Sequence, residues 1–154
     1  MSPTRRRFAE GTDVPVERSQ AELAGILRKH GVLRQAWASA PEGDTLQFEL
    51  EGHQYRLRIE RFDAEGLHAQ WELDGRPPTT LKYLPSDTQV QAEWRRRWRA
   101  IVLLLKAKLE FAEGDQSTVV RELMPYALLR DGRTLEEAIT DGDAGIPLLV
   151  AGRS

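Results

Sequence analysis

The segment TLQFELEGHQYRLRIE, residues 45–60, limits the folds open to this chain more than any other segment. Apolar and polar residues alternate on both sides of Gly52, as in two half-buried antiparallel strands. A two-residue turn at Gly52 and His53, with glycine first as a type II′ turn prefers, joins the two strands. This register pairs Leu50 with Tyr55, Phe48 with Leu57, and Leu46 with Ile59 on one face, and Glu49 with Arg56 on the other. The apolar face of such a hairpin must be covered by another element.

A long helix in the second half of the chain supplies that cover. It is predicted to begin near Ser86 or Asp87, to run to about Glu113, and to end at Gly114. One stripe at helical spacing carries its apolar residues, which are Trp94, Trp98, Ile101, Leu105 and Ala112, widened by Val102 and Leu109. We therefore predict an α+β fold, in which a small antiparallel sheet has one face covered by a long helix and is flanked by short helices.

Other elements are predicted before and after the hairpin. A first helix is expected from Ser19 to His30, because Ser19 and Glu22 have capping-box spacing and Gly31 supplies a stop. Alternation of apolar and polar residues predicts a third strand from Leu67 to Leu73, and a less regular strand from Val32 to Ala38. Three prolines favour a loop from Asp74 to Asp87.

The C-terminal part is predicted to contain short elements. A helix from about Ser117 to Met124 has Ser117 or Thr118 as its cap. An extended piece then leads into a turn at Asp131 and Gly132, followed by a terminal helix. Thr134 caps this helix, with Glu137 as its capping-box partner.

The domain organisation is simple. Residues Met1 to Val14 show no apolar periodicity and are expected to be a mobile arm, while residues 15–154 form a single α+β domain. The chain has no cysteine, which excludes disulfides, thiol catalysis and cysteine-bound metal and agrees with a cytoplasmic protein. The N-terminal region lacks the apolar stretch of a secretory signal, and the aliphatic run from Ala100 to Leu105 is too short to span a bilayer, so no membrane association is expected.

The net charge of −2 hides an uneven distribution. Six basic residues and no acidic residue lie between Trp94 and Lys108, in the long helix. The segments 42–74 and 110–143 each contain nine acidic and three basic residues. One basic helix therefore lies between two acidic segments. Such a charge distribution indicates binding partners or internal ion pairs, and it does not indicate a particular fold.

Several motifs together resemble those of a known group of proteins. They are V-P-V-E-x-S leading into the first helix, R-W-R-A before the aliphatic run, K-A-K-L-E after it, and D-G-R-T near the last helix. In this order they resemble a family of small uncharacterised proteins encoded by phages, prophages and mobile elements. The resemblance implies a mobile-element context, and it supplies no established activity and no catalytic residues.

The residue types of common active sites do not occur in the required patterns. His30, His53 and His68 are separated along the chain and are expected to be ordinary surface histidines. No phosphate-binding loop, dinucleotide fingerprint, nucleophile elbow or metal-ligand spacing is present in the sequence. We therefore expect a protein that is not an enzyme and that has no metal and no cofactor.

The basic flank of the long helix is the candidate binding site. On a wheel of 100° per residue, Trp94 and Trp98 belong to the buried stripe, while the arginines lie on a flank. That flank suits phosphate contacts, with help from the N-terminal arm, and the candidate residues are Arg95, Arg96, Arg99, Lys106, Arg5, Arg6 and Arg7. The alternative is a solvated flank in which Lys106 pairs with Glu110 and the arginines bridge to the acidic edge of the sheet.

Two functions from different classes follow from these observations. The first is a small phage or mobile-element accessory protein that acts through nucleic acid, or through a nucleic-acid-processing complex. The second is a protein-binding inhibitor of a host defence complex, whose acidic surface mimics nucleic acid. A structural role, in which the long helix packs into a homodimer, is a third alternative.

Overall fold

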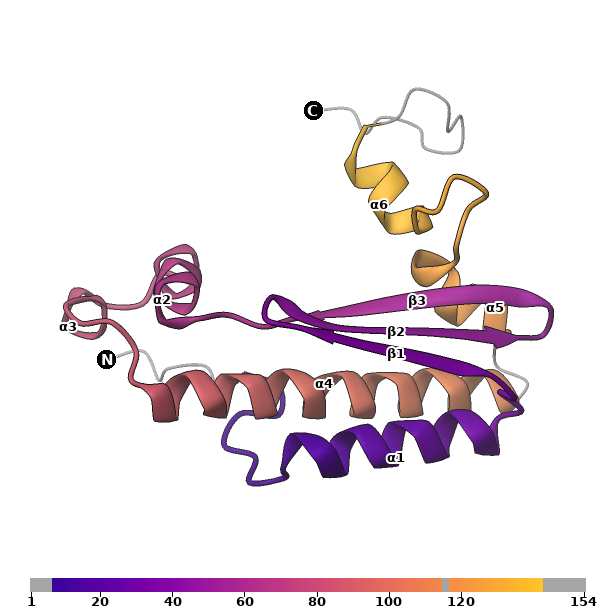
Figure 1. Ribbon diagram of the computed structural model, residues 1–154, viewed down its shortest axis with the longest axis horizontal. Coiled ribbons are helices and arrows are strands. Elements are labelled where there is room, and N and C mark those ends of the chain that lie inside the picture. The colour runs from indigo at the N-terminus through magenta and orange to yellow at the C-terminus, as the bar shows by residue number, and fades with distance from the viewer. Residues whose placement is uncertain (1–6, 115–116, 143–154) are drawn as a thin grey trace.

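A computed structural model describes residues 7–114 and 117–142 of the chain. Strands β1 (Gln35–Ala40), β2 (Gly43–Leu50) and β3 (His53–Glu60) form an antiparallel sheet in the order β1-β2-β3. Helices α1 (Val16–Lys29) and α4 (Asp87–Glu113) lie side by side against one face of this sheet (Figure 1). The fold is therefore α+β, as the sequence predicts.

The core lies between the sheet and these two helices. Trp94 and Trp98 are only 8% and 0% exposed, which confirms that the tryptophans of α4 are buried. The indole N–H of Trp98 donates to Asp44 at 3.1 Å, and its ring stacks on Trp37 at 5.8 Å. The remaining buried apolar residues come from the sheet and both helices, and they include Leu23, Leu27, Leu46, Phe48, Leu50, Tyr55, Leu57, Ile59, Val102, Leu105 and Leu109.

The hairpin has the predicted faces but a different register. Leu50 pairs with His53, Phe48 with Tyr55, and Leu46 with Leu57. The turn is made by Glu51 and Gly52, whose φ angles of 51° and 79° are both positive, as a type I′ turn requires. Moving the turn by one residue moves the pairing by two, so every apolar side chain stays on the covered face. Glu49 consequently lies opposite Gln54, and Arg56 lies opposite Gln47.

The first helix begins earlier than predicted and without the predicted capping box. It starts at Val16, after Pro15, and no side chain caps it. Ser19 lies on the buried face instead, 0% exposed, and its hydroxyl has no hydrogen-bond partner among the described residues. The reason is periodicity, because Ser19 shares the inward-facing stripe with Leu23 and Leu27.

The predicted third strand is wrong, because that segment is helix α2 (Ala64–Leu73). Asp63 caps it by accepting from the backbone N–H of Gly66, and Leu67 and Trp71 are buried at helical spacing. Leu73 should face the core if the segment were a strand, yet it is 83% exposed. The proline-containing segment that follows also holds one turn of helix, α3 (Pro78–Leu81).

The remaining elements agree with their sequence patterns. Strand β1 overlaps the irregular strand that was predicted from Val32 to Ala38. Helix α4 has Ser86 and Gln89 as a capping box and ends at Gly114. Thr118 caps α5 (Val119–Leu123), which leads into a short 3-10 helix, η1 (Met124–Tyr126). The terminal helix α6 (Leu135–Thr140) stands off the sheet (Figure 1), and it has the predicted capping box of Thr134 and Glu137.

The described part of the expected N-terminal arm lies against α4. The side chain of Arg7 bonds Glu93, and Arg96 donates to the carbonyl oxygen of Phe8 at 3.2 Å. Within the described residues, no helix combines the length and hydrophobicity that a membrane crossing requires.

Candidate functional site

Three guanidinium groups meet one carboxylate near the start of α4. Arg96 donates to both oxygens of Glu93, at 2.7 Å and 3.0 Å, and Arg7 approaches the same carboxylate at 2.9 Å. The Nε of Arg97 lies 3.4 Å from Glu93, while its guanidinium also stacks 4.3 Å from the centre of the Phe62 ring. The Glu93 side chain is 5% exposed. We call this group the Glu93 cluster.

The protonation of the Glu93 cluster follows from its contacts. Burial alone would raise the pKa of Glu93, but hydrogen bonds from Arg96 and the charges of Arg96, Arg7 and Arg97 hold that pKa below its ordinary value. The same hydrogen bonds raise the pKa of Arg96, because they favour its charged form. The cluster is therefore an internal ion network that fastens residue 7 to α4.

Two contacts between side chains connect α1 to α4. Arg99 pairs with Glu22, and the Nδ1 atom of His30 lies 2.6 Å from a Glu113 oxygen. The first contact joins the middles of the two helices and the second joins their C-terminal ends, so α1 and α4 run in the same direction (Figure 1). The His30 side chain is 4% exposed, so this histidine is not the surface residue that we expected.

The contact between Glu22 and Arg99 lies in the middle of a regular arrangement of cations. Arg18 and Lys29 are four residues before and seven after Glu22, which places both on the side of α1 that meets α4. Arg95 and Lys106 have the same spacing from Arg99 on α4. Because the helices are parallel, Arg18 and Arg95 lie at a similar level along the helix axes, as do Lys29 and Lys106. We call Arg18, Lys29, Arg95 and Lys106 the α1–α4 seam.

None of the four seam cations has an ion-pair or hydrogen-bond partner among residues 7–114 and 117–142. Arg18, Lys29 and Lys106 are exposed, and Arg95 is half-buried. The predicted pairing of Lys106 with Glu110 is absent from the described residues, and Lys108 contacts Glu122 of α5 instead, at 3.7 Å. Like charges on facing helices repel, and an anion between them relieves that repulsion.

The predicted binding residues therefore fall into two groups. Arg7, Arg96 and Arg99 are bonded to carboxylates, while Arg95 and Lys106 are open to a ligand. Arg5 and Arg6 lie outside the described residues. Arg18 and Lys29 were missed, although their spacing around Glu22 repeats that of Arg95 and Lys106 around Arg99. A comparison of the helical-wheel projections of the two helices could have identified them.

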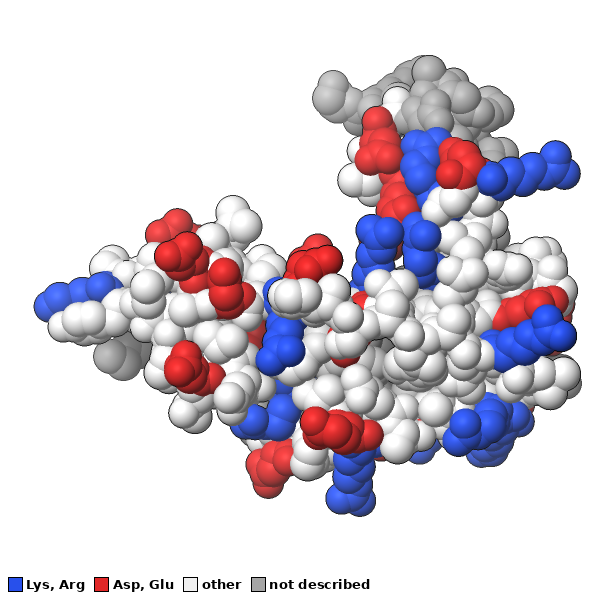
Figure 2. Space-filling model, in the orientation of Figure 1, with Lys and Arg blue, Asp and Glu red and all other residues white. Residues whose placement is uncertain are grey.

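Three carboxylates of the segment 110–142 pair with the chain's own arginines. Glu137 of α6 lies 2.9 Å from Arg56 and 3.7 Å from Arg58, and Arg133 pairs with Asp131 and Asp141. Hydrogen bonds from Arg133 lower the pKa of Asp131. Basic and acidic groups are accordingly interspersed over the face shown in Figure 2.

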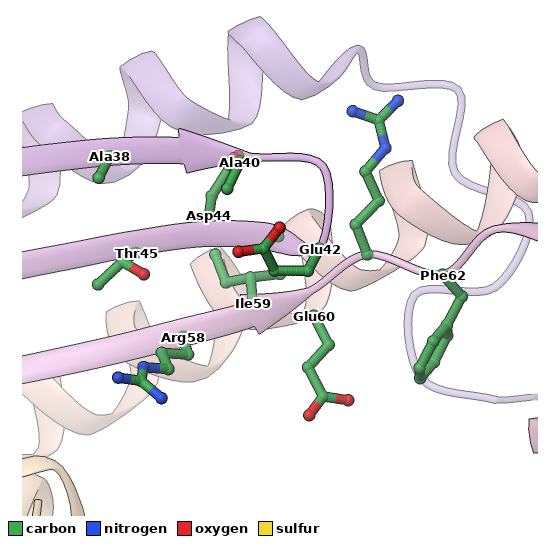
Figure 3. Close-up of a pocket in the computed structure, with 11 residues that line it drawn as sticks. Ala38, Ala40, Glu42, Asp44, Thr45, Arg58, Ile59, Glu60 and Phe62 are labelled. Carbon is green, nitrogen blue, oxygen red and sulfur yellow. The ribbon is translucent and has the colours of Figure 1, made fainter. Parts of the chain in front are cut away.

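An open hollow lies at the end of the sheet, beside the turn between β1 and β2. Its volume is about 630 Å³. Figure 3 shows that the side chains of Glu42, Arg58 and Glu60 point in different directions and do not converge on one point. In addition, no group of three or more histidine, aspartate or glutamate side chains in the described part of the chain is placed to hold a metal ion.

Comparisons of the chain with protein-family models, with curated proteins and with solved structures find no match.

Proposed function

We propose that the protein is a small, non-enzymatic, cytoplasmic accessory protein of a phage or mobile element that contacts nucleic-acid phosphates through the α1–α4 seam. The supporting observation is a set of four cations that have no carboxylate partner in the described part of the chain, on two helices joined by the contact of Arg99 with Glu22. Lysine and arginine neutralise backbone phosphates without regard to sequence, so this contact favours general binding over recognition of particular bases.

The rigidity of the surface supports the same function. Both helices have a buried side, in which Leu23 and Leu27 of α1 and Trp98, Val102 and Leu105 of α4 are all 0% exposed. The cations are therefore held by a packed scaffold, and little backbone ordering is required when a ligand binds. At 1.5 Å per residue, the seam cations of each helix are spread over about 16 Å, a length that several phosphates of one strand can follow.

Binding measured by fluorescence anisotropy with labelled single- and double-stranded DNA tests the proposal. At about 50 mM salt the protein should bind, and at about 200 mM the affinity should fall by about tenfold or more, because counterions are released on binding. Absence of salt-sensitive binding at the lower concentration would reject the proposal.

A matched pair of variants locates the contact. One variant replaces the seam cations by glutamine (Arg18, Lys29, Arg95 and Lys106), and the control replaces four exposed cations elsewhere (Arg34, Lys82, Arg121 and Arg130). Both variants lose the same formal charge. The seam variant should lose about tenfold or more in affinity while the control stays much closer to wild type. Equal losses would show that net charge matters and the seam does not.

Inhibition of a host defence complex by an acidic surface receives less support. Such mimicry needs an array of uncompensated carboxylates, whereas Glu137, Asp131 and Asp141 contact arginines of the same chain.

A homodimer through α4 is a second candidate, favoured by one observation. Ala100, Leu104, Ala107 and Phe111 follow each other at spacings of four, three and four residues on the outer side of α4, as in a coiled-coil seam. Leu104 and Phe111 are 37% and 50% exposed. Sedimentation equilibrium should then show a dimer that Phe111→Glu converts to monomer and that Leu73→Glu, on the exposed side of α2, leaves unchanged. A wild-type monomer at all concentrations would exclude this candidate.

A further inference from the structure

A small pocket that is open to solvent, which we call the cavity, lies where the N-terminal segment, α2 and α4 meet. Its volume is about 170 Å³, which corresponds to roughly six water molecules at about 30 Å³ each. Three guanidinium groups line it, those of Arg7, Arg76 and Arg96, together with Trp71 and Gln89. The volume can hold a small anion, or a charged terminal group of a larger anionic ligand.

The charges around this cavity do not balance. Glu93 carries one negative charge and receives Arg7 and Arg96, which both line the cavity, so this part of the lining has an excess of one positive charge. Arg76 adds one more, with its guanidinium 4.6 Å from the centre of the Trp71 ring. Glu10, the second carboxylate that lines the cavity, offsets one of these charges. An excess of one positive charge remains among the residues that line the cavity, and it favours an anionic ligand.

Two buried donors at the cavity have no acceptor among the described residues. They are the indole N–H of Trp71 and the Nε–H of Arg7. Trp71 is 5% exposed, so its N–H is deprived of bulk water as well. A buried donor that lacks an acceptor costs about 1–3 kcal/mol, and a bound water, ion or ligand oxygen would satisfy it.

We propose that this cavity is a binding site for a phosphate group, which accepts hydrogen bonds from Trp71 and Arg7 and is paired with Arg76. The site is separate from the α1–α4 seam, and its occupation does not depend on the function proposed for that seam. The ligand is an oxyanion because every unsatisfied group at the cavity is a donor and the surplus charge is positive.

The indole N–H resonances of ¹⁵N-labelled protein test this site directly. The chain has four tryptophans, and Trp71→Phe identifies the resonance of Trp71 by its loss. Inorganic phosphate should shift that resonance along a saturating curve, whereas sodium chloride at the same ionic strength should not. A phosphate titration that moves the Trp71 signal no more than chloride does would overturn the proposal.

Arg76→Gln and Lys82→Gln form a matched pair for the second measurement. Lys82 also stacks on an aromatic ring, that of Tyr83 at 5.5 Å, but it does not line the cavity. Arg76→Gln should weaken phosphate binding by about tenfold, while Lys82→Gln should leave it unchanged. Unchanged binding in Arg76→Gln, with the protein folded by circular dichroism, would contradict the site. This variant keeps the test valid even if Trp71→Phe does not fold.

A third measurement distinguishes two sources of the phosphate group. A trinucleotide is added with and without a 5′-phosphate. If only the trinucleotide with the 5′-phosphate shifts the Trp71 signal, and the one without it does not, the cavity binds the end of a nucleic-acid strand. A response to inorganic phosphate and to neither trinucleotide assigns it to a free ion. If no phosphate compound shifts the signal, the proposal is wrong.

Discussion

The Glu93 cluster and the α1–α4 seam contain the same kinds of basic residue in different surroundings. In the cluster, Arg7, Arg96 and Arg97 share a carboxylate that is 5% exposed. In the seam, Arg95 and Lys106 lie on the same side of α4 as Arg99 and have no carboxylate partner within the described residues. Arg95 and Arg96 are adjacent in the sequence, yet a rotation of 100° separates a cation open to a ligand from one that holds the fold together. Contact with a carboxylate, and not the number of arginines, therefore distinguishes the cations of the cluster from those of the seam.

Removing the shared carboxylate should have the largest effect on stability. Glu93→Ala leaves three guanidiniums without their counter-ion, and breaking a buried pair by deleting one partner costs about 3–5 kcal/mol. Urea unfolding should show this loss. Glu110→Ala, an exposed position of the same helix, should change the free energy of unfolding by less than about 0.5 kcal/mol. Similar small losses in both variants would mean that the cluster does not stabilise the fold.

The neighbouring arginines provide the next comparison. Arg96→Met should cost about 1.5–3 kcal/mol, because Glu93 loses charged hydrogen bonds while it remains buried. Arg95→Met should lie within about 0.5 kcal/mol of wild type, because Arg95 has no such bond. Urea unfolding measures both changes. A loss of unfolding free energy in Arg95→Met as large as that in Arg96→Met would contradict the distinction between the cluster and the seam.

The pH dependence of stability sharpens the account of the cluster. The pKa of Glu93 is lower in the folded protein than in the unfolded chain, so its contribution is present above the ordinary glutamate value of about 4.3. That contribution is lost as the pH falls through the lower folded-state pKa. Wild type should therefore lose stability more steeply below pH 4.3 than Glu93→Gln does. Parallel curves for the two proteins would contradict the assignment.

The contact between Arg99 and Glu22 should give the smallest effect. Both side chains are partly exposed, at 21% and 34%, so solvent screens their attraction. A double-mutant cycle with Arg99→Ala and Glu22→Ala should give a coupling energy of about 0.2–1 kcal/mol. A coupling energy above about 2 kcal/mol would contradict this account, because it would mean that the pair is as strongly coupled as the buried Glu93 cluster.

Local patterns were enough to predict the parts of the fold that local interactions decide. The apolar stripe of α4 and its ends at Ser86 and Gly114 follow from side chains within a few residues of one another. The capping box of Thr134 and Glu137 is equally local. The faces of the hairpin were predictable too, because alternation determines them, but its register was not. Two turns one residue apart preserve the same faces, so the sequence pattern does not choose between them.

Tertiary packing decided the elements that the sequence pattern misplaced. Leu67 and Trp71 fit either a strand or a helix, and the cap at Asp63 together with burial against α4 selects the helix. Ser19 and Glu22 have capping-box spacing, but packing places Ser19 in the core. The candidate site shows the same limit. The pairing of Arg99 with Glu22 and of Arg7 with Glu93 depends on residues that lie far apart in the chain. By contrast, the pairing of Arg96 and Arg97 with Glu93 is local, at spacings of three and four residues, and the sequence could have shown it.

The salt dependence of DNA affinity tests the central claim most directly, because its slope counts the phosphates that a protein neutralises. Wild type and the two matched variants, with either the seam cations or four distant cations replaced by glutamine, are measured from about 50 to 200 mM salt. If the seam contacts phosphates, the slope of log K against log salt falls by about 3 in the seam variant and hardly changes in the control. Equal slopes in all three proteins would contradict the claim that the seam cations bind nucleic acid.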